Sequence, residues 1–258
     1  MHERDEADSN APFRLDGRVC LITGGTRGIG AAIARDFAAS GARVILTGRR
    51  IADAEAVAQE IPDAIAIAYD AASPGEAGRL ADQVAGRAGG LDILVNNAAI
   101  LKPHYIAKLT ESEFDELFQV NVKASLFLCQ ALHPMLKQGR VPAVVNITAA
   151  GGHVPMAGIG AYSATKAALL NLTRTLAKEW ARDGIRVNAL TPGSVATDMI
   201  LPNDPDRRTK FVADMAETNL MKRLADPIEI ARAARFLASE AASFVTGQTL
   251  IVDGGLLA

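Results

Sequence analysis

Short apolar runs alternate with longer Ala-rich stretches along most of the chain. In the longer stretches apolar residues recur every three or four positions, as at Leu169, Leu172 and Leu176, which is the period of a helix with one buried face. These stretches predict helices near residues 28–40, 51–60, 74–88, 111–138, 161–182 and 227–239. The short runs predict strands at residues 18–23, 43–47, 64–69, 91–96, 143–148, 186–190 and 249–252.

This alternation predicts an α/β fold. Short apolar strands separated by helices form a parallel sheet that is buried on both faces, and right-handed crossovers make it doubly wound, or Rossmann-type. We expect about seven strands in a single domain over residues 15–258, after a flexible tail at residues 1–14. Residues 199–220 interrupt the alternation with two prolines and a charged run. They predict a loop and short helix that cover a substrate at the carboxyl edge of the sheet.

Composition and charge exclude several classes of protein. The chain has 27 Lys+Arg and 29 Asp+Glu, so its net charge of -2 provides no field that attracts nucleic acid or an anionic membrane. No apolar run approaches the ~20 residues that cross a bilayer, and the acidic start lacks the apolar core of a signal peptide. The two cysteines have no partner at metal-ligand spacing. We therefore expect a soluble cytoplasmic protein that acts on a small molecule, with no metal and no nucleic-acid or membrane partner.

The first predicted strand leads into Thr23-Gly-Gly-Thr-Arg-Gly-Ile-Gly30 and then into a helix. Glycines at 24, 28 and 30 allow a sharp turn, a close approach to a pyrophosphate and tight packing of the helix on the sheet. The amides and the positive dipole end at the helix start attract phosphate. A plain tight turn would use glycine too, and the spacing differs from G-x-G-x-x-G. The position between strand and helix nevertheless favours a dinucleotide site.

The end of the second predicted strand indicates which dinucleotide binds. An Asp or Glu there would bind the adenosine ribose 2′-hydroxyl and repel a 2′-phosphate. The chain instead has Thr47-Gly-Arg-Arg50, and Arg27 lies in the glycine turn close by. We expect NADP(H) to be preferred over NAD(H), with Arg49 as the main contact to the phosphate; the alternative is that these arginines are solvated surface residues. Asp70, after the third strand, is a candidate for binding the adenine amino group or for capping a helix, and the two roles are compatible.

Tyr162 and Lys166 lie four positions apart in a predicted helix, so their side chains share one face. Such a pair means little alone, but here it occurs with the glycine turn, Asn96-Asn-Ala-Ala99, Asn121 and Thr191-Pro-Gly193. With these motifs, residues 15–258 resemble the short-chain dehydrogenase/reductase family, and most closely its bacterial 3-oxoacyl-carrier-protein reductase-like branch.

The resemblance implies a role for each of these residues. Tyr162 would protonate a carbonyl oxygen during reduction or accept a hydroxyl proton during oxidation. Lys166, together with the positive nicotinamide of the oxidised cofactor, would lower the pKa of the phenol from about 10, and would also bind the nicotinamide ribose. Asn121 would break its helix locally and hold a water that links Lys166 to solvent. The implied cofactor contacts are Gly24, Thr26, Arg27, Gly28, Ile29, Gly30, Arg49, Asp70, Ala71, Asn97, Ala98, Ala99, Tyr162, Lys166, Pro192, Gly193, Val195 and Thr197.

The chain departs from the family pattern at one position. The family places a Ser thirteen residues before the Tyr, where it hydrogen-bonds the substrate oxygen, and here that residue is Ala149. Thr148 carries a hydroxyl one residue earlier, although side chains alternate across a strand. Three explanations stay open: Thr148 substitutes for the Ser, Tyr162 acts alone at a reduced rate, or the Ala is an engineered replacement.

These features predict an NADP(H)-dependent carbonyl reductase or alcohol dehydrogenase that interconverts a ketone and a secondary alcohol. The alternative function, suggested by Ala149, is a weakly active or inactive NADP(H)-binding sensor or partner protein. The resemblance also implies a homotetramer or homodimer.

Overall fold

The computed structural model describes residues 10–258. Its strands are β1 (Val19–Ile22), β2 (Arg43–Gly48), β3 (Ile65–Ala68), β4 (Ile93–Asn96), β5 (Ala143–Ile147), β6 (Arg186–Pro192) and β7 (Thr249–Val252). Its α-helices are α1 (Gly28–Ala39), α2 (Ile51–Ala58), α3 (Glu76–Ala88), α4 (Glu111–Phe118), α5 (Ala124–Leu136), α6 (Gly160–Trp180), α7 (Pro205–Glu217) and α8 (Pro227–Ala238).

Within these residues the strands form one seven-stranded sheet in the order β3-β2-β1-β4-β5-β6-β7. Every neighbouring pair is parallel. The predicted α/β fold, a Rossmann-type sheet with flanking helices, is confirmed. The strand order reverses direction between β1 and β4, and ligands of such sheets bind outside the carboxyl ends of the strands at this point.

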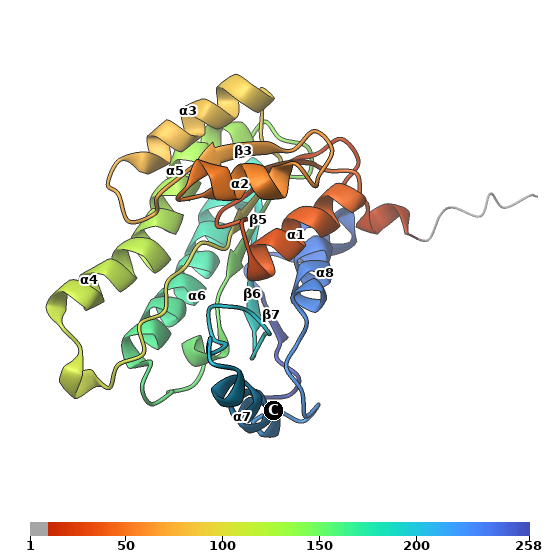
Figure 1. Ribbon diagram of the computed structural model, residues 1–258. Coiled ribbons are helices and arrows are strands. Elements are labelled where there is room, and N and C mark those ends of the chain that lie inside the picture. Colours follow the sequence, from red (N-terminus) through yellow and green to blue (C-terminus); the bar gives the residue numbers. More distant parts are fainter. Residues whose placement is uncertain (1–9) are drawn as a thin grey trace, which may run out of the picture.

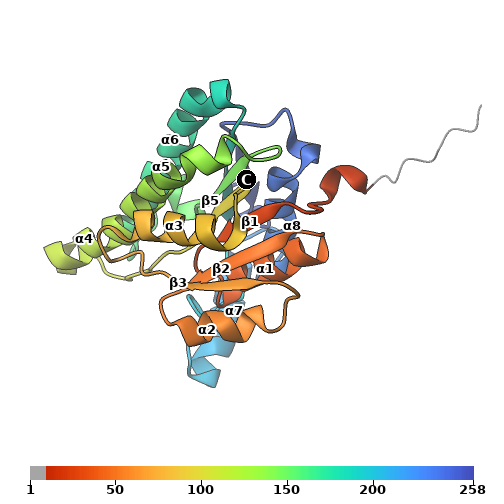
Figure 2. The same cartoon turned by 90° about the horizontal axis from the view of Figure 1, so that it is seen from above.

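Helices cover both faces of the sheet (Figures 1 and 2). Buried side chains of α1, α2 and α8 form one apolar cluster with the sheet, and those of α3, α5 and α6 form a second cluster on the opposite face. Successive residues of a strand contribute to opposite clusters: Leu21 packs with the α3/α5/α6 group, whereas Ile22 packs with α1 and α8. Burial on both faces explains why the strands read as continuous apolar runs in the sequence.

Two buried arginines hold the end of α8 against the amino edge of the sheet. Arg186 donates to the carbonyl oxygens of Leu237 (2.7 Å), Ala238 (3.3 Å) and Ser239 (3.1 Å). Arg18 donates to the carbonyl oxygen of Ala238 at 2.8 Å. The last carbonyls of a helix lack partners within the helix and carry its negative dipole end, so guanidinium groups satisfy both their hydrogen bonds and their charge.

The structure differs from the sequence prediction in one long helix. The predicted helix at 111–138 consists of α4 and α5, separated by a π-helical turn at Gln119–Lys123. Residues 199–220 contain α7, and their role in covering a substrate stays a prediction. Residues 1–9 of the predicted flexible tail lie outside the described residues; farther along, Ala11–Phe13 form a 3-10 turn, and the Phe13 ring packs 6.4 Å from the Phe236 ring, centre to centre.

Candidate active site

The glycine turn connects β1 to α1 at the carboxyl edge of the sheet, beside the end of β4. Gly24 has φ +65°, and a Cβ at this position would lie 3.0 Å from Cα of Ala98. A Cβ on Gly30 would lie 2.2 Å from the carbonyl oxygen of Gly24. Both positions therefore require glycine: at Gly24 because of backbone conformation and at Gly30 because helix and turn approach so closely.

Thr23 and Asn97 fix the shape of this turn. The backbone amides of Asn97 and Ala98 both donate to Thr23 Oγ1 at 3.0 Å. In return, Asn97 Nδ2 donates to the carbonyl oxygens of Thr23 (2.9 Å) and Gly24 (3.0 Å). The sequence predicted backbone contacts from Asn97 to a cofactor but missed this bracing role of its side chain and of Thr23. The loop after β4 thus sets the conformation of the loop after β1.

The first turn of α1 is open to a ligand. Arg27 is the N-cap residue and has extended backbone angles, and no side chain among residues 10–258 caps the helix there. The first amides of a helix without such a cap are free to bind phosphate oxygens. Thr197 stands beside this turn, since its Cγ2 would lie 3.1 Å from a Cβ placed on Gly28. The predicted contact residues Gly28, Ile29, Gly30 and Thr197 therefore lie together.

The end of β2 is tied to the same turn. The amide of Gly25 donates to the carbonyl oxygen of Thr47 at 2.8 Å, and Thr26 packs against Gly48. Arg50 forms an ion pair with Asp53 at 2.8 Å. Arg27 and Arg49 are exposed, and neither side chain has a hydrogen-bond or ion-pair partner among residues 10–258. Their guanidinium groups are available to an anion next to the glycine turn.

Asp70 caps the loop after β3. Its Oδ1 accepts a hydrogen bond from the amide of Ala72 at 3.0 Å, and its Oδ2 accepts one from Ser73 Oγ at 3.2 Å. The carbonyl oxygen of Ala71 accepts from Gln119 Nε2 at 3.2 Å. Asp70 thus stabilises a turn and does not cap α3, whose N-cap residue is Gly75, and its contact with adenine stays a prediction.

Tyr162 and Lys166 lie one turn apart near the start of α6. The Lys166 side chain is buried, and its ammonium lies 5.6 Å from the centre of the Tyr162 ring. The ammonium donates to the carbonyl oxygen of Ile147 at 2.9 Å, which fixes it at the end of β5. The pair therefore faces the carboxyl edge of the sheet, where β4, β5 and β6 end.

Burial shifts the pKa of both groups toward the neutral form. It raises the pKa of Tyr162 above the usual range of a phenol and lowers the pKa of Lys166 to about 8. Tyr162 is consequently a protonated phenol at neutral pH. The lowering of its pKa by Lys166 together with a bound oxidised nicotinamide stays a prediction.

Asn121 lies in the π-helical turn, where the amide of Ala124 donates to the carbonyl oxygen of Gln119. The side chain of Asn121 is buried, and its Oδ1 accepts from the amide of Ile100 at 2.9 Å. Its Nδ2 donates to the carbonyl oxygen of Ile100 (3.0 Å) and to Thr165 Oγ1 (3.1 Å). Asn121 thus connects the loop after β4 to α6 at the residue before Lys166. The local break that the resemblance implied is present, while the water relay stays a prediction.

Ala149 follows β5 and is half-buried, with extended backbone angles. The hydroxyl of Thr148 points to a different set of partners, because it contacts the carbonyl oxygen of Leu190 at 3.1 Å and Thr191 Oγ1 at 2.7 Å. Nε2 of His153 lies 3.0 Å from the same Thr191 hydroxyl. Thr148 is thus already engaged within the protein, and it reaches a substrate only if these contacts break.

The end of β6 supplies the remaining predicted contacts, Pro192, Gly193 and Val195. The amide of Gly193 donates to the carbonyl oxygen of Val252 at 3.0 Å. A Cβ on Gly193 would lie 2.7 Å from Cα of Asp253, so the turn after β7 packs directly behind this segment. Val195 is buried and forms an isolated parallel bridge with Ala225.

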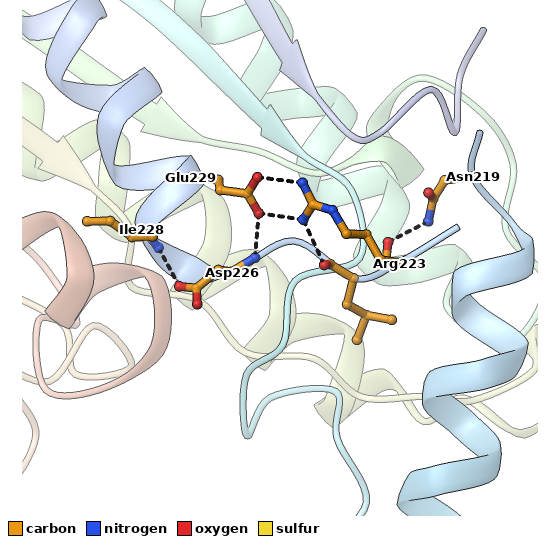
Figure 3. A network of polar contacts seen from close by, with 6 residues as sticks. Asn219, Arg223, Asp226, Ile228 and Glu229 are labelled. Atoms are coloured by element: carbon orange, nitrogen blue, oxygen red, sulfur yellow. Dashed lines mark hydrogen bonds and ion pairs between the residues drawn. The ribbon is translucent and has the colours of Figure 1, made fainter. Parts of the chain in front are cut away.

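Helix α7 covers this edge of the sheet and is anchored through residues that follow it (Figure 3). Arg223 binds Glu229 of α8 through two hydrogen bonds of 2.7 Å, and this contact lowers the pKa of Glu229 to about 2. Asn219 Nδ2 donates to the carbonyl oxygen of Arg223 at 2.9 Å. No side chain of α7 is fully buried among the described residues. The helix is fixed at its C-terminal end but packs only loosely on the rest of the molecule.

Comparisons with known proteins agree with this arrangement. A family model described as enoyl-(acyl carrier protein) reductase matches residues 24–257. 3-Oxoacyl-[acyl-carrier-protein] reductase FabG of Aquifex aeolicus is 35% identical over 250 residues, which are 95% of this chain and 99% of that protein. The chain belongs to the short-chain dehydrogenase/reductase family.

Other members of the short-chain dehydrogenase/reductase family have different activities. Galactitol 2-dehydrogenase (L-tagatose-forming) of Cereibacter sphaeroides is 39% identical over 252 residues, which are 96% of this chain and 98% of that protein. A short chain dehydrogenase from Burkholderia cenocepacia J2315, solved in complex with NADP, has a TM-score of 0.87 and 36% identity, covering 95% of this chain and 100% of its own. The protein is therefore an oxidoreductase of this family, and the family supports a nicotinamide cofactor.

Two features that would indicate other classes are missing from the described residues. None of the helices in residues 10–258 is both long and apolar enough to span a membrane. The same residues contain no group of three or more His, Cys, Asp or Glu arranged to hold a metal ion.

Proposed function

We propose that this short-chain dehydrogenase/reductase uses NADP(H) to interconvert a ketone and a secondary alcohol, with Tyr162 as general acid and base. The observation that carries the proposal is the Tyr162–Lys166 pair, in which a buried ammonium lies 5.6 Å from the phenol ring. The pair occupies the edge of the sheet at which the glycine turn also lies. A proton donor and a dinucleotide cradle at one edge are what reversible hydride transfer to a carbonyl requires.

The cradle fits a nicotinamide dinucleotide. Gly24 and Gly30 let the turn, the loop after β4 and the start of α1 pack closely together, and the first amides of α1 have no side-chain cap among residues 10–258. Arg49 and Arg27 would bind an adenosine 2′-phosphate, since β2 ends without a carboxylate that would repel it. These features support NADP(H) over NAD(H).

The mechanism assigns the proton to Tyr162. The glycine turn and the first amides of α1 would hold a nicotinamide dinucleotide, which would supply the hydride for reduction of the carbonyl carbon or take it up in oxidation of the carbinol carbon. During reduction, Tyr162 donates its phenolic proton to the carbonyl oxygen, which becomes the hydroxyl of the product. The Lys166 ammonium stabilises the phenolate that remains, and we propose that a water bound near Asn121 carries the replacement proton from solvent through Lys166.

Tyr162 carries the proton that reduction consumes. Burial raises the pKa of the phenol, so this proton is in place at neutral pH. Oxidation would require the phenolate, whose formation the positive charge of an oxidised nicotinamide would favour.

The test is Tyr162→Phe, assayed for turnover of a ketone panel with NADPH and for NADPH binding by fluorescence titration. Loss of the proton donor should lower kcat by about 1,000-fold while NADPH still binds. Tyr69→Phe is the matched control, because Tyr69 is buried in the core beside α3 and α5, and it should retain full activity. Unchanged turnover in Tyr162→Phe would refute the mechanism.

Ala149 favours a second candidate, an NADP(H)-binding sensor or partner protein with little or no catalysis. The missing serine hydroxyl removes one hydrogen-bond donor to the substrate oxygen, and Thr148 is engaged with Leu190 and Thr191. Micromolar NADPH binding combined with no turnover of any ketone or alcohol would support this candidate over the enzyme.

We also propose a homotetramer or homodimer. Apolar side chains are exposed at Phe114 on α4, at Phe127 on α5 and at Ile251 on β7, and contacts between subunits would cover them. Sedimentation equilibrium would test this proposal.

A further inference from the structure

The loops that follow β4, β5 and β6 expose apolar side chains at the edge of the sheet toward which the Tyr162–Lys166 pair faces. Parallel strands end at one edge, so these loops meet above the ends of their strands. Tyr105 and Ile106 after β4 are 67% and 68% exposed, Val154 after β5 is 39% exposed, and Met199 after β6 is 44% exposed. Three neighbouring loops thus place large apolar groups in solvent at the same edge of the sheet.

Contacts connect two of these loops to the start of α6. The side chain of Ile106 packs on Gly160, which lies two residues before Tyr162. A Cβ placed on Gly160 would lie 3.0 Å from Cδ1 of Ile106. Met156 packs on Gly151, and Gly151 in turn lies against Ser163, next to Tyr162. Apolar groups of the β4 and β5 loops therefore pack on or beside the first turn of α6, which carries Tyr162.

Helix α7 adds a third apolar side. Its half-buried residues are Phe211, Val212, Met215 and Ala216, which lie on one face, while the residues between and around them are exposed. Sδ of Met215 lies 4.0 Å from the hydroxyl of Ser194, which follows Gly193 at the predicted nicotinamide end. The half-buried face of α7 is therefore directed toward Ser194 and the segment that follows β6.

Charged groups are few in the loops after β4 and β5. Lys102 contacts Glu116 and His104 Nε2 lies 3.0 Å from Glu113, both on α4, whereas Lys108 is exposed and has no ion-pair partner among residues 10–258. Residues 149–161, which lead to Tyr162, contain no Asp, Glu, Lys or Arg. The β5 loop thus offers few groups that could bind a series of hydroxyls.

We propose that the substrate is an apolar ketone or secondary alcohol, with hydrocarbon on both sides of the reacting carbon. The inference rests on the proposed function and names the substrate class of that site. A hydrocarbon chain gains free energy when the rim removes it from water, whereas each hydroxyl of a sugar or polyol loses hydrogen bonds with water that an apolar rim does not replace. The rim, here Tyr105, Ile106, Val154, Met156, Met199 and Met215, therefore selects against polyhydroxylated compounds.

A substrate panel with purified wild-type protein and NADPH tests the class. The panel contains 2-octanone, acetophenone and 1-decalone as apolar ketones, L-tagatose and D-fructose as ketoses, and acetoacetyl-coenzyme A as an anionic thioester. We expect kcat/KM for the best apolar ketone to exceed that of every ketose and of the thioester by about 100-fold. A ketose or the thioester as best substrate would overturn the substrate class while leaving the proposed function intact. Turnover of no compound, with NADPH still bound, would overturn both.

Rim variants test the contact itself. Ile106→Asn and Val154→Asn replace exposed apolar side chains, so they should fold, and each should lower kcat/KM for 2-octanone by about tenfold, mainly through KM. Phe244→Asn is the control: Phe244 is fully exposed but precedes β7, at the opposite edge of the sheet, and its kinetics should not change. Unchanged kinetics in both rim variants would overturn the inference. A change in the oligomeric state, measured by sedimentation, without a change in kinetics would also overturn the inference. The rim would then be a contact between copies of the chain.

Discussion

The ammonium of Lys166 lies 2.9 Å from the carbonyl oxygen of Ile147, the last residue of β5. This hydrogen bond holds a buried cation at the edge of the sheet without a carboxylate partner. The charge therefore remains available to the neighbouring phenol, and burial sets the pH at which that charge is lost.

The pKa of about 8 for Lys166 predicts a decline in reduction at alkaline pH. The pKa is lowered, so the ammonium is charged below pH 8 and neutral above it, and only the charged form stabilises the phenolate that reduction leaves on Tyr162. The rate of ketone reduction should fall about tenfold between pH 7 and pH 9, as measured from kcat across this range. Lys166→Arg keeps its charge throughout and should show no such decline, whatever its absolute rate. A flat profile for the wild type would contradict the assignment.

Restoring the serine should increase activity. Ala149→Ser returns a hydrogen-bond donor to the position that the family uses for the substrate oxygen, and such donors contribute about 100-fold to rate. We therefore expect kcat/KM for the best ketone to be higher in Ala149→Ser than in the wild type. Ala149→Cys, similar in size but a weak donor, should change little. An equal rate in Ala149→Ser and the wild type would show that the position does not limit turnover.

Cofactor preference should depend on Arg49. Arg49→Asp removes the guanidinium and adds a carboxylate that repels a 2′-phosphate, so the ratio of kcat/KM for NADPH to that for NADH should fall by about 10- to 100-fold. Arg50→Asp is the control, because Arg50 is already paired with Asp53, and its ratio should stay close to that of the wild type. Preferential use of NADH by the wild type would contradict our interpretation of the end of β2.

Stability should depend on Arg186, far from the chemistry. Arg186→Met leaves the carbonyl oxygens at the end of α8 without their donors, and unsatisfied buried acceptors cost about 1–3 kcal/mol each. We expect the free energy of unfolding, measured by urea denaturation, to fall by about 3 kcal/mol. Arg182→Met, on an exposed turn after α6, should leave it unchanged. A small effect in Arg186→Met would mean that water replaces the guanidinium.

Most of the fold could be predicted from the hydrophobic pattern. Strands such as β5 are buried on both faces, so they appear as uninterrupted apolar runs. In the helices between them apolar residues recur every three or four positions. The break between α4 and α5 could not be predicted in this way, because the π-helical turn leaves the apolar pattern continuous. Asn121 was the only local signal, and it gained meaning from the resemblance and not from periodicity.

The site was predictable to a smaller extent. Spacing placed Tyr162 and Lys166 on one face of a helix, and the glycine turn indicated a dinucleotide. The pairing of Thr23 with Asn97 joins residues that are 74 positions apart, and no local pattern encodes it. The shift in the pKa of Tyr162 could not be predicted from the sequence either, because desolvation depends on what surrounds the phenol in three dimensions.

The loose packing of helix α7 affects how this protein can evolve. Among the described residues it contributes no fully buried side chain, so most substitutions along it leave the stability of the main body almost untouched. Mutation and selection can therefore alter its thirteen residues while the hydride-transfer machinery beneath stays the same. Exchange of this helix between relatives would accordingly be a direct route to chimeric enzymes with new selectivity.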